Sequence, residues 1–592
     1  MIVATRIEEH GNIKLRIWMV LILAVFAFAA IIGRLFEKQI IQYDHYQSLA
    51  YNQRFREEKI RPARGNIYVT DIYSDTKYPL VANKTFWALM VVPNQIDDPV
   101  ELANILGPII EISPAEISEK LSQSTVYIPP IKHKLTDAQR ETIESLNLPG
   151  VTMLPEVYRD YPEGTMGSKF LGFVDSNGEG QYGVEGYLND ILKGEDGKLI
   201  AERDVLGRQI TVANNKMIVP KNGQDVVLTI DRVIQFFAEE NIKKSVEAHQ
   251  ADSGSVVVMN PKTGEILALA EYPTYDPAVY NEVKPEDYEI FKTMAVSDPY
   301  ESGSVFKPLS MASGIDTGAV KKDDGEYFEA NVQVDDYVIW NSERKAHGYE
   351  TMTQVLENSD NVGMVWMIKK LGKDKFYEYL DRFRFNKMTG VEISGEEVGF
   401  MQPKKYVPDV GVATMSFGQG ITVTEMQLVQ AMGAIANDGL IVQPHIVKAY
   451  IDKKGNKTDI KTNILGRALS ETTAKQIKEM LVSVVERGHG KQAKVKGYYI
   501  GGKTGTAQIP LKDRRGYEAD KFTGSFLGLG PTDDPQFVMI VRINVPKDVI
   551  WAESTAAPVF GEMARDIINY YQLPPDQFWA DEQTKREKGL ID

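Results

Sequence analysis

The sequence predicts an α+β protein of several domains. We expect an N-terminal transmembrane helix, an irregular β-rich pedestal, and a larger domain in which helices cover a central antiparallel sheet. Three observations support this prediction. The chain has 592 residues, too many for one ordinary domain. One segment near the N-terminus is apolar and uncharged. Strand-like runs lie near both ends of the second half of the chain, with helix-like runs between them.

The apolar segment is long enough to cross a membrane. Residues 17–33 carry no charge, and apolar residues continue to Phe36 after a single arginine. About 20 residues span a bilayer core, and the basic residues ahead of the segment favour a cytoplasmic N-terminus. We therefore predict a cytoplasmic tail at 1–16 and an anchor at 17–36. A cleaved signal peptide is the alternative, because Ala27-Phe28-Ala29 has the small-x-small form of a cleavage site.

The region after the anchor is polar and irregular, and residues 87–92 form one of its short strand-like runs. Helical periodicity at 97–123 predicts a small helical insertion, at about 97–150. A stretch rich in Pro, Gly and Asn at 212–225 suggests a boundary. The predicted domains are a pedestal or dimerisation-like module at 37–215, a catalytic domain at 222–575 and a charged tail at 576–592.

The second half contains the elements expected to form the central sheet and its helices. Residues 260–264 (Asn-Pro-Lys-Thr-Gly) have the composition of a hairpin turn. The predicted strands are 226–230, 255–259, 265–270, 525–529 and 537–543, and the predicted helices include 233–246, 354–371 and 424–436.

Composition excludes several classes of function. The formal net charge of −15 argues against a nucleic-acid-binding protein, which would need a basic face. The chain has no cysteine, which excludes disulfides, thiolate metal sites and a cysteine nucleophile. Its seven histidines show no metal-ligand spacing. We predict neither a metal nor a cofactor.

Three copies of the Ser-x-x-Lys pattern occur, at Ser304–Lys307, Ser74–Lys77 and Ser342–Lys345. A nucleophilic serine needs a base beside it, and a lysine three residues later lies on the same face of a helix. Burial and a helix N-terminus both disfavour the ammonium form. Apolar residues surround only the copy at 304–307, so Lys307 is expected to be the neutral base. The other two copies lie among charged and polar residues.

Two further motifs follow in a fixed order. Ser359-Asp360-Asn361 comes after Ser304, and Lys503-Thr504-Gly505 begins a strand-like run at 503–509. A second Lys-Thr-Gly, at 262–264, lies in the predicted hairpin turn, where it has a structural role. The set Ser-x-x-Lys, Ser-x-Asn and Lys-Thr-Gly is the known signature of penicillin-binding proteins and class A β-lactamases.

The chain resembles the class B penicillin-binding proteins. The segment 300–308 (Tyr-Glu-Ser-Gly-Ser-Val-Phe-Lys-Pro) is similar to their active-site box, with Ser302 where the family usually has proline. Residues 502–508 are similar to the third box. The resemblance extends from about Pro62 to Phe560. Its other matches include Arg159, 161–162, 171–174, Glu185, 203–204, 207–208, 228–231, 416–420 and 556–560.

The resemblance implies a peptidoglycan D,D-transpeptidase that forms a serine acyl-enzyme and is inhibited by β-lactams. In this family the nucleophile attacks the penultimate D-alanine of a stem peptide, and an amine from a second stem peptide resolves the ester. By resemblance, Ser304 is the nucleophile, Lys307 its base, Ser359 a proton relay and Lys503 an electrostatic support. The implied substrate-binding residues are Asn361, Thr504, Gly505 and Thr506, with the backbone N–H groups of Ser304 and Thr506 as the oxyanion hole.

The resemblance also implies a location and partners. The protein would cross the bacterial cytoplasmic membrane once, with its catalytic domain outside. Its partners would be nascent peptidoglycan, β-lactams, the membrane, a polytopic glycosyltransferase and other divisome proteins. The segment 416–424 is closer to the division or septal group, and an elongation-type enzyme is the alternative. In the pedestal, Arg159, Asp204 and Arg208 are expected to join subdomains, with Glu185 as a partner.

Parts of the sequence also fit other functions. Residues 497–504 satisfy the pattern of a phosphate-binding loop, which would require a helix directly after Lys503-Thr504. The next residues instead form a β-like run ending at Pro510. A non-catalytic penicillin-binding scaffold or sensor is a second alternative. A β-lactamase-like hydrolase would need a water-activating carboxylate, and a bifunctional class A enzyme would need a glycosyltransferase domain ahead of the transpeptidase.

Overall fold

The computed structural model describes residues 4–47, 55–122, 128–202, 216–511 and 516–575. The chain divides into two compact units, one made of 1–62 and 194–222 and the other of 63–193 and 223–592. The first unit contains helix α1 (Ala4–Phe36), the π-helical turn η1 (Glu37–Ile41) and an antiparallel sheet of β1 (Phe55–Ile60), β8 (Gly197–Glu202) and β9 (Lys216–Ile218).

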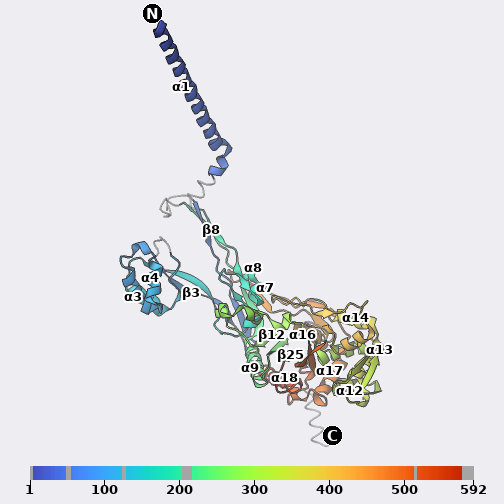
Figure 1. The fold of residues 1–592 in the computed structure, drawn as a ribbon. Coiled ribbons are helices and arrows are strands. Elements are labelled where there is room, and N and C mark those ends of the chain that lie inside the picture. Colours follow the sequence, from blue (N-terminus) through green and yellow to red (C-terminus); the bar gives the residue numbers. More distant parts are fainter. Residues whose placement is uncertain (1–3, 48–54, 123–127, 203–215, 512–515, 576–592) are drawn as a thin grey trace. The chain divides into compact units, whose positions relative to one another are not determined.

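Helix α1, labelled in Figure 1, includes the predicted anchor. Within Ile13–Ile41, an 18-residue window has a mean hydropathy of 2.6 and is not buried within the protein. Within the described residues, this is the one helix that is long and apolar enough to cross a membrane. The predicted segment 17–36 lies inside it.

The second unit contains a seven-stranded sheet in the order β21-β20-β10-β2-β3-β4, with β5 also paired to β3. Strand β10 pairs in parallel with β2 and antiparallel with β20. The predicted strand 226–230 is thus present as β10, but our expectation that it belongs to the central sheet is wrong, because its two edges are taken by β2 and β20. The bounds are β2 (Ile67–Asp71), β3 (Ser74–Val91), β4 (Lys132–Leu135), β5 (Val151–Asp160), β10 (Asp225–Asp231), β20 (Val447–Ile451) and β21 (Lys457–Asp459).

The two compact units do not coincide with the predicted domains, which meet at 215–222. The seven-stranded sheet explains the difference. Strand β2 comes from the predicted pedestal, whereas β10 and β20 come from the predicted catalytic domain. Ile67 of β2, Leu228 of β10 and Val447 of β20 belong to one buried cluster. The part of the pedestal nearest the catalytic domain therefore shares a hydrophobic core with it.

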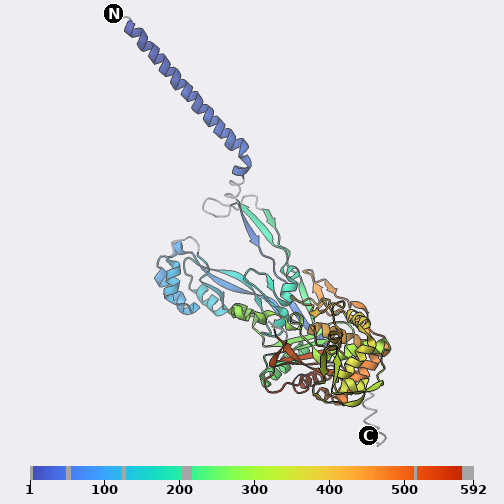
Figure 2. The same ribbon diagram turned by 45° about the vertical axis from the view of Figure 1, so that its right-hand side comes forward.

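The predicted helical insertion consists of α3 (Pro99–Ile110), α4 (Pro114–Leu121) and α5 (Asp137–Ser145). These helices gather at one end of the long strand β3 (Figures 1 and 2) and bury a small core of their own against Leu89 and Val91. The side chains of Asp98, Ser113 and Thr136 cap their N-termini. Pro114 begins α4, as predicted.

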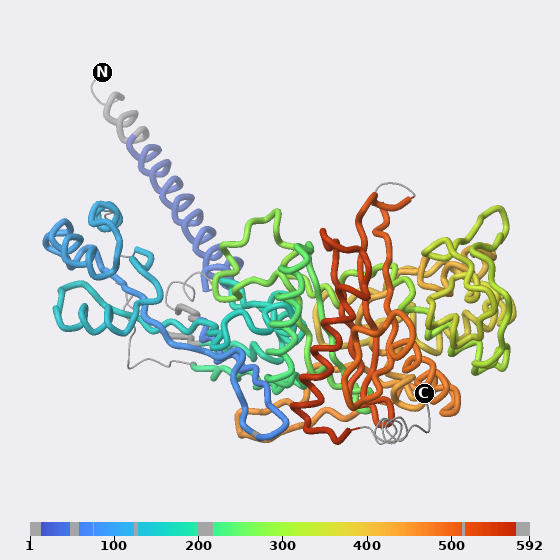
Figure 3. The backbone as a smooth tube through the Cα atoms, turned by 90° about the horizontal axis from the view of Figure 1, so that it is seen from below, coloured from blue at the N-terminus to red at the C-terminus, as the bar shows by residue number. Residues whose placement is uncertain are grey.

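The central sheet has the order β12-β11-β25-β24-β23, and all its pairs are antiparallel. Alternate residues face opposite sides, so Val256 packs in one cluster and Val257 in another. Helices α9 and α18 cover the first face, while α11, α16 and α17 cover the second. Figure 3 shows α18, in red, beside the last strands of the sheet. The bounds are β11 (Ser253–Met259), β12 (Ile266–Tyr272), β23 (Gly501–Pro510), β24 (Tyr517–Gly530), β25 (Phe537–Asn544), α9 (Arg232–Ala248), α11 (Lys307–Asp316), α16 (Glu425–Ala436), α17 (Glu471–Glu486) and α18 (Ala556–Tyr570).

Shorter elements complete the unit. Before the central sheet lie η2 (Pro93–Gln95), α6 (Ser168–Leu171), β6 (Phe173–Val174), β7 (Gly180–Gln181), α7 (Gly183–Tyr187) and α8 (Asn189–Lys193). Between β12 and β23 lie η3 (Pro277–Glu282), η4 (Pro285–Phe291), α10 (Met294–Ser297), η5 (Gly303–Phe306), β13 (Gly325–Phe328), β14 (Asn331–Val334), β15 (Tyr337–Trp340), β16 (Gly348–Thr351), α12 (Met352–Glu357), α13 (Asn361–Leu371), α14 (Lys373–Arg382), β17 (Phe400–Met401), α15 (Asp409–Met415), β18 (Ile421–Thr422), β19 (Leu440–Val442), β22 (Ile464–Arg467) and η6 (Lys491–Ala493).

One predicted helix is divided in two. The segment 354–371 is predicted as one helical stretch, but α12 ends at Glu357 and α13 starts at Asn361. Ser359 between them has a φ of 54°, a left-handed conformation that interrupts a right-handed helix. Asp360 then caps α13 by accepting a hydrogen bond from the Gly363 N–H. The prediction of a single helix is wrong, and the break lies at a predicted site residue.

Candidate active site

Ser304 lies in the 3₁₀ turn η5, directly ahead of helix α11. Gly303 makes the sharp entry to this turn with a φ of 59°. Ser304 is partly exposed, whereas Val305 and Phe306 are buried. Lys307 begins α11 and Pro308 lies in its first turn, where a proline removes no intrahelical hydrogen bond. The predicted turn and helix are therefore both present.

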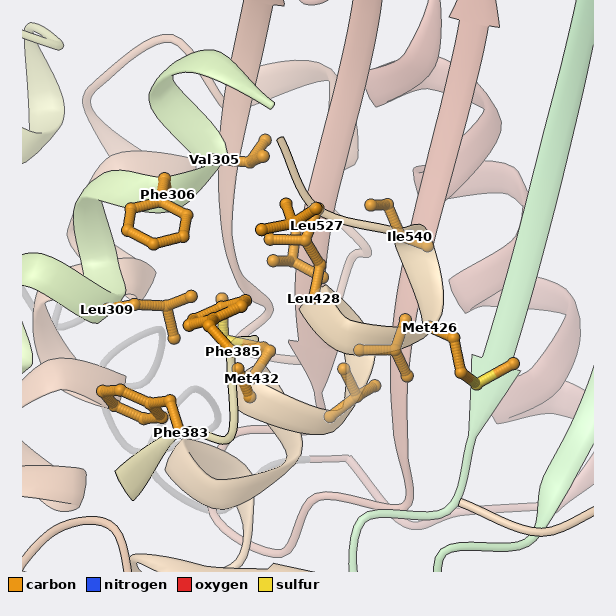
Figure 4. Packing of buried hydrophobic residues seen from close by; sticks show 14 of the residues in the cluster. Val305, Phe306, Leu309, Phe383, Phe385, Met426, Leu428, Met432, Leu527 and Ile540 are labelled. Carbon is orange, nitrogen blue, oxygen red and sulfur yellow. The ribbon is translucent and has the colours of Figure 1, made fainter. Parts of the chain in front are cut away.

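An apolar wall holds this turn in place. Val305, Phe306 and Leu309 belong to a buried cluster that also contains Leu428 of α16 and Leu527 of β24 (Figure 4). This cluster joins the turn to the central sheet. Core packing on the buried side of the turn therefore fixes the position of Ser304.

Lys307 is fully buried. Its Nζ donates to the Ser359 carbonyl oxygen at 2.5 Å and to Ser359 Oγ at 3.2 Å. Burial, and secondarily the neighbouring Lys503, holds the pKa of the Lys307 ammonium well below its ordinary value, while Asp360 and Glu350 act in the opposite direction. This direction favours the neutral amine, which is the form that the sequence predicts for the base.

Lys503 lies on strand β23 and is also fully buried. Its Nζ donates to the Thr504 carbonyl oxygen at 3.1 Å and to Thr504 Oγ1 at 3.4 Å. Burial lowers the pKa of Lys503 to about 7, and Glu553 opposes that shift. Both predicted lysines are therefore buried, and their charges are coupled to each other.

Strand β23 lies against the turn that carries Ser304. A Cβ atom at Gly505 would lie 2.8 Å from the Ser302 carbonyl oxygen and 2.9 Å from the Val305 nitrogen. Only glycine allows this approach, so the Lys-Thr-Gly motif has a packing reason for its third residue. Thr506 follows it, and its Oγ1 accepts a hydrogen bond from the Ala552 N–H at 3.2 Å. The hydroxyl proton of Thr506 stays available for a ligand.

The Ser-x-Asn motif supplies Ser359 and Asn361 from the break between α12 and α13. Ser359 meets Lys307 through the two hydrogen bonds given above. Asn361 Nδ2 donates to the Trp340 carbonyl oxygen at 2.9 Å. The structure thus brings Ser359 to Lys307, and Gly505 of the third box to the turn of Ser304.

The competing motif copies lie elsewhere. Ser342 is exposed, and Lys345 pairs with Glu343 at 3.2 Å. Ser74 begins β3, where its Oγ donates to Asp71, and Lys77 is exposed. These two copies lack the buried lysine of the Ser304 copy.

The second Lys-Thr-Gly and the phosphate-loop pattern are also explained by the fold. Lys262 is in the exposed turn between β11 and β12 and pairs with Asp534 at 2.5 Å. The residues after Lys503-Thr504 continue strand β23 instead of starting a helix. Since a phosphate-binding loop needs a helix N-terminus at that point, the structure excludes this alternative.

Sequence reasoning missed several buried polar residues around the site. Asn341 is only 2% exposed and bonds to the Ser359–Asn361 segment, as described below. Arg542 lies 4.0 Å from the centre of the Tyr300 ring and pairs with Glu425 at 3.5 Å. Tyr300 in turn bonds Ser525. Tyr300 begins the active-site box, but Asn341, Arg542, Glu425 and Ser525 belong to no short motif, so only their three-dimensional contacts reveal them.

The two Lys-Thr-Gly copies give a direct test. The resemblance implies that Thr504 bonds the penicillin carboxylate, and a hydrogen bond to a charged group contributes about 1.5–3 kcal/mol, so we expect Thr504→Ala to slow acylation by penicillin by roughly 10- to 150-fold. Thr263→Ala is the matched control, since Thr263 Oγ1 bonds only its turn neighbours, including Glu265 at 3.0 Å. The measurement is the second-order rate constant with a fluorescent penicillin. Equal losses in both variants would contradict the assignment.

Two protein-family models match the chain. The penicillin binding protein transpeptidase domain matches residues 254–569, and the penicillin-binding protein dimerisation domain matches residues 59–228. The two regions together cover nearly all of the central sheet, its helices other than α9, and most of the predicted pedestal.

Curated relatives match over nearly the whole length. Stage V sporulation protein D of Bacillus subtilis is 34% identical over 573 residues, which are 96% of this chain and 87% of the relative. The probable peptidoglycan D,D-transpeptidase PenA of Neisseria meningitidis is 29% identical over 569 residues, 95% of this chain and 93% of the relative.

Solved structures share the fold. A peptidoglycan synthetase from Bifidobacterium adolescentis is 26% identical, with a TM-score of 0.71 over 88% of this chain and 98% of that chain. Penicillin binding protein 3 from Mycobacterium tuberculosis, complexed with aztreonam, is 25% identical, with a TM-score of 0.67 over 88% and 98% of the two chains.

Proposed function

Because the chain belongs to the class B penicillin-binding proteins, we propose that Ser304 is the residue acylated in its peptidoglycan D,D-transpeptidase reaction. The enzyme joins stem peptides of peptidoglycan and binds β-lactams. The single observation that carries the assignment is the buried Lys307 three residues after Ser304, bonded to Ser359. The order and placement of the three motifs support it.

The proposed reaction has two steps. The Ser304 hydroxyl oxygen attacks the carbonyl carbon of the penultimate D-alanine, while the neutral amine of Lys307 accepts the hydroxyl proton. The tetrahedral oxyanion is held by the backbone N–H groups of Ser304 and Thr506. The terminal D-alanine leaves as an amine after receiving a proton through the Lys307–Ser359 pair. An amine of a second stem peptide then attacks the ester, forms the new amide and returns the Ser304 hydroxyl.

The remaining motif residues bind the substrate in this proposal. Asn361 bonds the substrate amide, and Thr504 and Thr506 bind the terminal carboxylate. Gly505 places this strand beside the nucleophile. Lys503 supplies a positive charge next to the carboxylate and to Lys307.

The decisive experiment is mass spectrometry of the protein after reaction with penicillin. We expect a single covalent adduct, and the modified peptide should contain Ser304. A scaffold or sensor that only binds penicillin would give the same adduct, and it is distinguished by its failure to join stem peptides in a transpeptidation assay. An adduct that disappears on brief incubation, with free penicilloate released, would favour the hydrolase alternative.

Acylation should depend on pH with two limbs. As the pH rises through about 7, Lys503 loses its proton and its favourable charge, so the rate should fall. As the pH falls through the lowered pKa of Lys307, the base becomes protonated and the rate should fall again. Lys503→Arg keeps a charge at every accessible pH and should remove the alkaline limb, even at a lower maximal rate. A wild-type rate that stays constant up to pH 9 would contradict a role for the Lys503 charge.

For its cellular place, we propose one membrane crossing with the catalytic domain outside the cytoplasm. The apolar helix α1 and the extracytoplasmic location of peptidoglycan support this topology. Protein recovered from membranes should keep its N-terminus and resist washing with alkaline carbonate. A soluble protein with a new N-terminus at Ala30 would show that the segment is a signal peptide.

We assign the enzyme to septal wall synthesis rather than to elongation, from the resemblance of residues 416–424 to the division group. Its partners would then be a polytopic glycosyltransferase and other divisome proteins. Depletion in the source bacterium should give filaments, whereas rounded cells would indicate elongation. The name of the Bacillus subtilis relative makes a sporulation-specific role the second candidate, which normal growth with a defect confined to sporulation would support.

A further inference from the structure

The segment Ser359–Asn361 has a conformation that its own sequence does not favour. Ser359 has a φ of 54°, which is unfavourable for a residue with a side chain. Residues 357–361 are all polar and favour a break between two helices, but they do not by themselves fix the left-handed conformation at Ser359. Surrounding contacts must therefore hold the segment in the shape that brings Ser359 to Lys307.

The amide of Asn341, just beyond the end of β15, makes four hydrogen bonds, and three of them are to residues 360–362. Its Oδ1 accepts from the Asn361 N–H at 2.8 Å and from the Val362 N–H at 3.2 Å. Its Nδ2 donates to Asp360 Oδ2 at 2.6 Å and to the Lys345 carbonyl oxygen at 3.2 Å. Asn341 is 2% exposed, so water does not replace these bonds.

The partner of this amide is a buried carboxylate. Asp360 is fully buried, and its Oδ1 accepts from the Gly363 N–H at 2.6 Å as the cap of α13. The Nε2 atom of His347 lies 4.0 Å from Asp360 Oδ2. The amide of Asn341 and the N–H of Gly363 are therefore direct donors to the two oxygens of Asp360. Loss of the first would remove a hydrogen bond from one oxygen of a buried carboxyl group.

We infer that Asn341 is a positioning residue for acylation, which holds the main chain of Ser359–Asn361 so that Ser359 faces Lys307 and Asn361 faces the substrate. This inference rests on the proposed function of Ser304. Asn341 acts through the motif and does not itself react. The backbone of Trp340 adds to the same support by accepting a hydrogen bond from Asn361 Nδ2 at 2.9 Å.

The hydrogen-bond pattern allows a test by exchange of the two polar groups. Asn341→Ala removes all four bonds, and Asn341→Asp keeps the acceptor for the Asn361 and Val362 N–H groups but sets two carboxylates against each other. Asn341→Asp combined with Asp360→Asn restores a donor and an acceptor across the same contact, with their roles reversed. An asparagine is as good an N-cap as an aspartate, so α13 keeps its cap.

We expect Asn341→Ala and Asn341→Asp each to lower the rate constant for acylation by fluorescent penicillin by about 10- to 100-fold, since small misplacements of catalytic groups cost up to about 100-fold. The double variant restores the contact with position 360 but leaves an oxygen of residue 341 facing the Lys345 carbonyl oxygen, so its rate should lie at least about threefold above that of Asn341→Asp without reaching the wild-type rate. Asn331→Ala is the matched control, because Asn331 pairs with Trp340 across the β14–β15 hairpin and should acylate at the wild-type rate. Rates are divided by the folded fraction, which is measured by thermal unfolding in the same buffer.

Three outcomes would overturn the inference. Asn341→Ala could acylate at the wild-type rate per folded molecule. The loss could appear equally in Asn331→Ala, which would indicate a general effect on the hairpin. The double variant could be as slow as Asn341→Asp, which would show that the contact with Asp360 is not what matters. A wild-type protein that is not acylated at Ser304 would instead refute the proposed function, so the two failures are distinguishable.

Discussion

Replacing Ser304 by alanine is expected to abolish covalent labelling by penicillin, with a loss of at least about 10³-fold in acylation rate. Removal of a nucleophile eliminates the bond that forms in the first step, and losses of up to about 10⁶-fold are known for serine enzymes. The structure gives no reason for a large change in stability. Ser304 is partly exposed, and the buried Val305 and Phe306 hold the turn. The measurement is gel fluorescence after timed labelling, together with the melting temperature.

The other two Ser-x-x-Lys copies serve as matched controls for this experiment. Ser342→Ala and Ser74→Ala should label at the wild-type rate, because neither serine has a buried lysine beside it. Lys307→Ala should fail to label even though the nucleophile is present, since the proton acceptor is gone. Persistent labelling of Ser304→Ala at the wild-type rate would refute the assignment.

Much of this site could be predicted from the sequence because its requirements are local. The nucleophile and base lie three residues apart, and the apolar residues around them are neighbours in the chain. The structure buries Lys307 together with these apolar neighbours. The strand at 503–509 was likewise predictable from its composition and its final proline. The apolar neighbours and the strand pattern distinguish the active-site copies of Ser-x-x-Lys and Lys-Thr-Gly from the copies elsewhere in the chain.

The rest depends on contacts between distant parts of the chain. The amide of Asn341 reaches a residue 19 positions away, and no pattern in the intervening sequence reveals this. The parallel pairing of β10 with β2 joins strands more than a hundred residues apart, so the strand itself was predicted but its sheet was not. The break at Ser359 was missed because apolar helical patterns flank the short polar run 357–361 on both sides. Asp204 and Arg208, two residues expected to join the pedestal subdomains, lie outside the described residues.

The third expected pedestal contact is present, with a partner that the sequence did not indicate. Glu185 on α7 is fully buried between Arg159 and Arg64. Its Oε1 accepts from Arg159 Nε at 2.9 Å, and its Oε2 accepts from Arg64 Nε at 2.8 Å. Burial acts to raise the pKa of Glu185, but the two guanidinium groups outweigh it and the pKa is lowered. The carboxylate therefore holds two positive charges inside the protein.

We expect Glu185→Gln to destabilise the protein by about 3–5 kcal/mol, because it leaves two buried guanidinium groups without a counter-charge. The measurement is denaturation by urea followed by tryptophan fluorescence. Glu195→Gln is the control, since Glu195 and its partner Lys221 have side chains 71% and 73% exposed and such pairs contribute at most about 1 kcal/mol. The folded fraction of Glu185→Gln should still acylate at the wild-type rate, because the ion pairs of Glu185 contain no residue of the proposed catalytic set.

The pH dependence of this variant separates the ion pairs from simple packing. A carboxylate with a lowered pKa contributes stability above its ordinary value of 4.5, and the contribution is lost as the pH falls through the lowered pKa. The difference in unfolding free energy between wild type and Glu185→Gln should therefore be largest near neutral pH and shrink in acid. A difference that stays constant from pH 7 to pH 3 would mean that the glutamine disturbs packing and that the charge of Glu185 contributes little. Because Ile67 and Val69 of β2 share a core with the central-sheet residues, a destabilised pedestal should also lower the stability of the catalytic part.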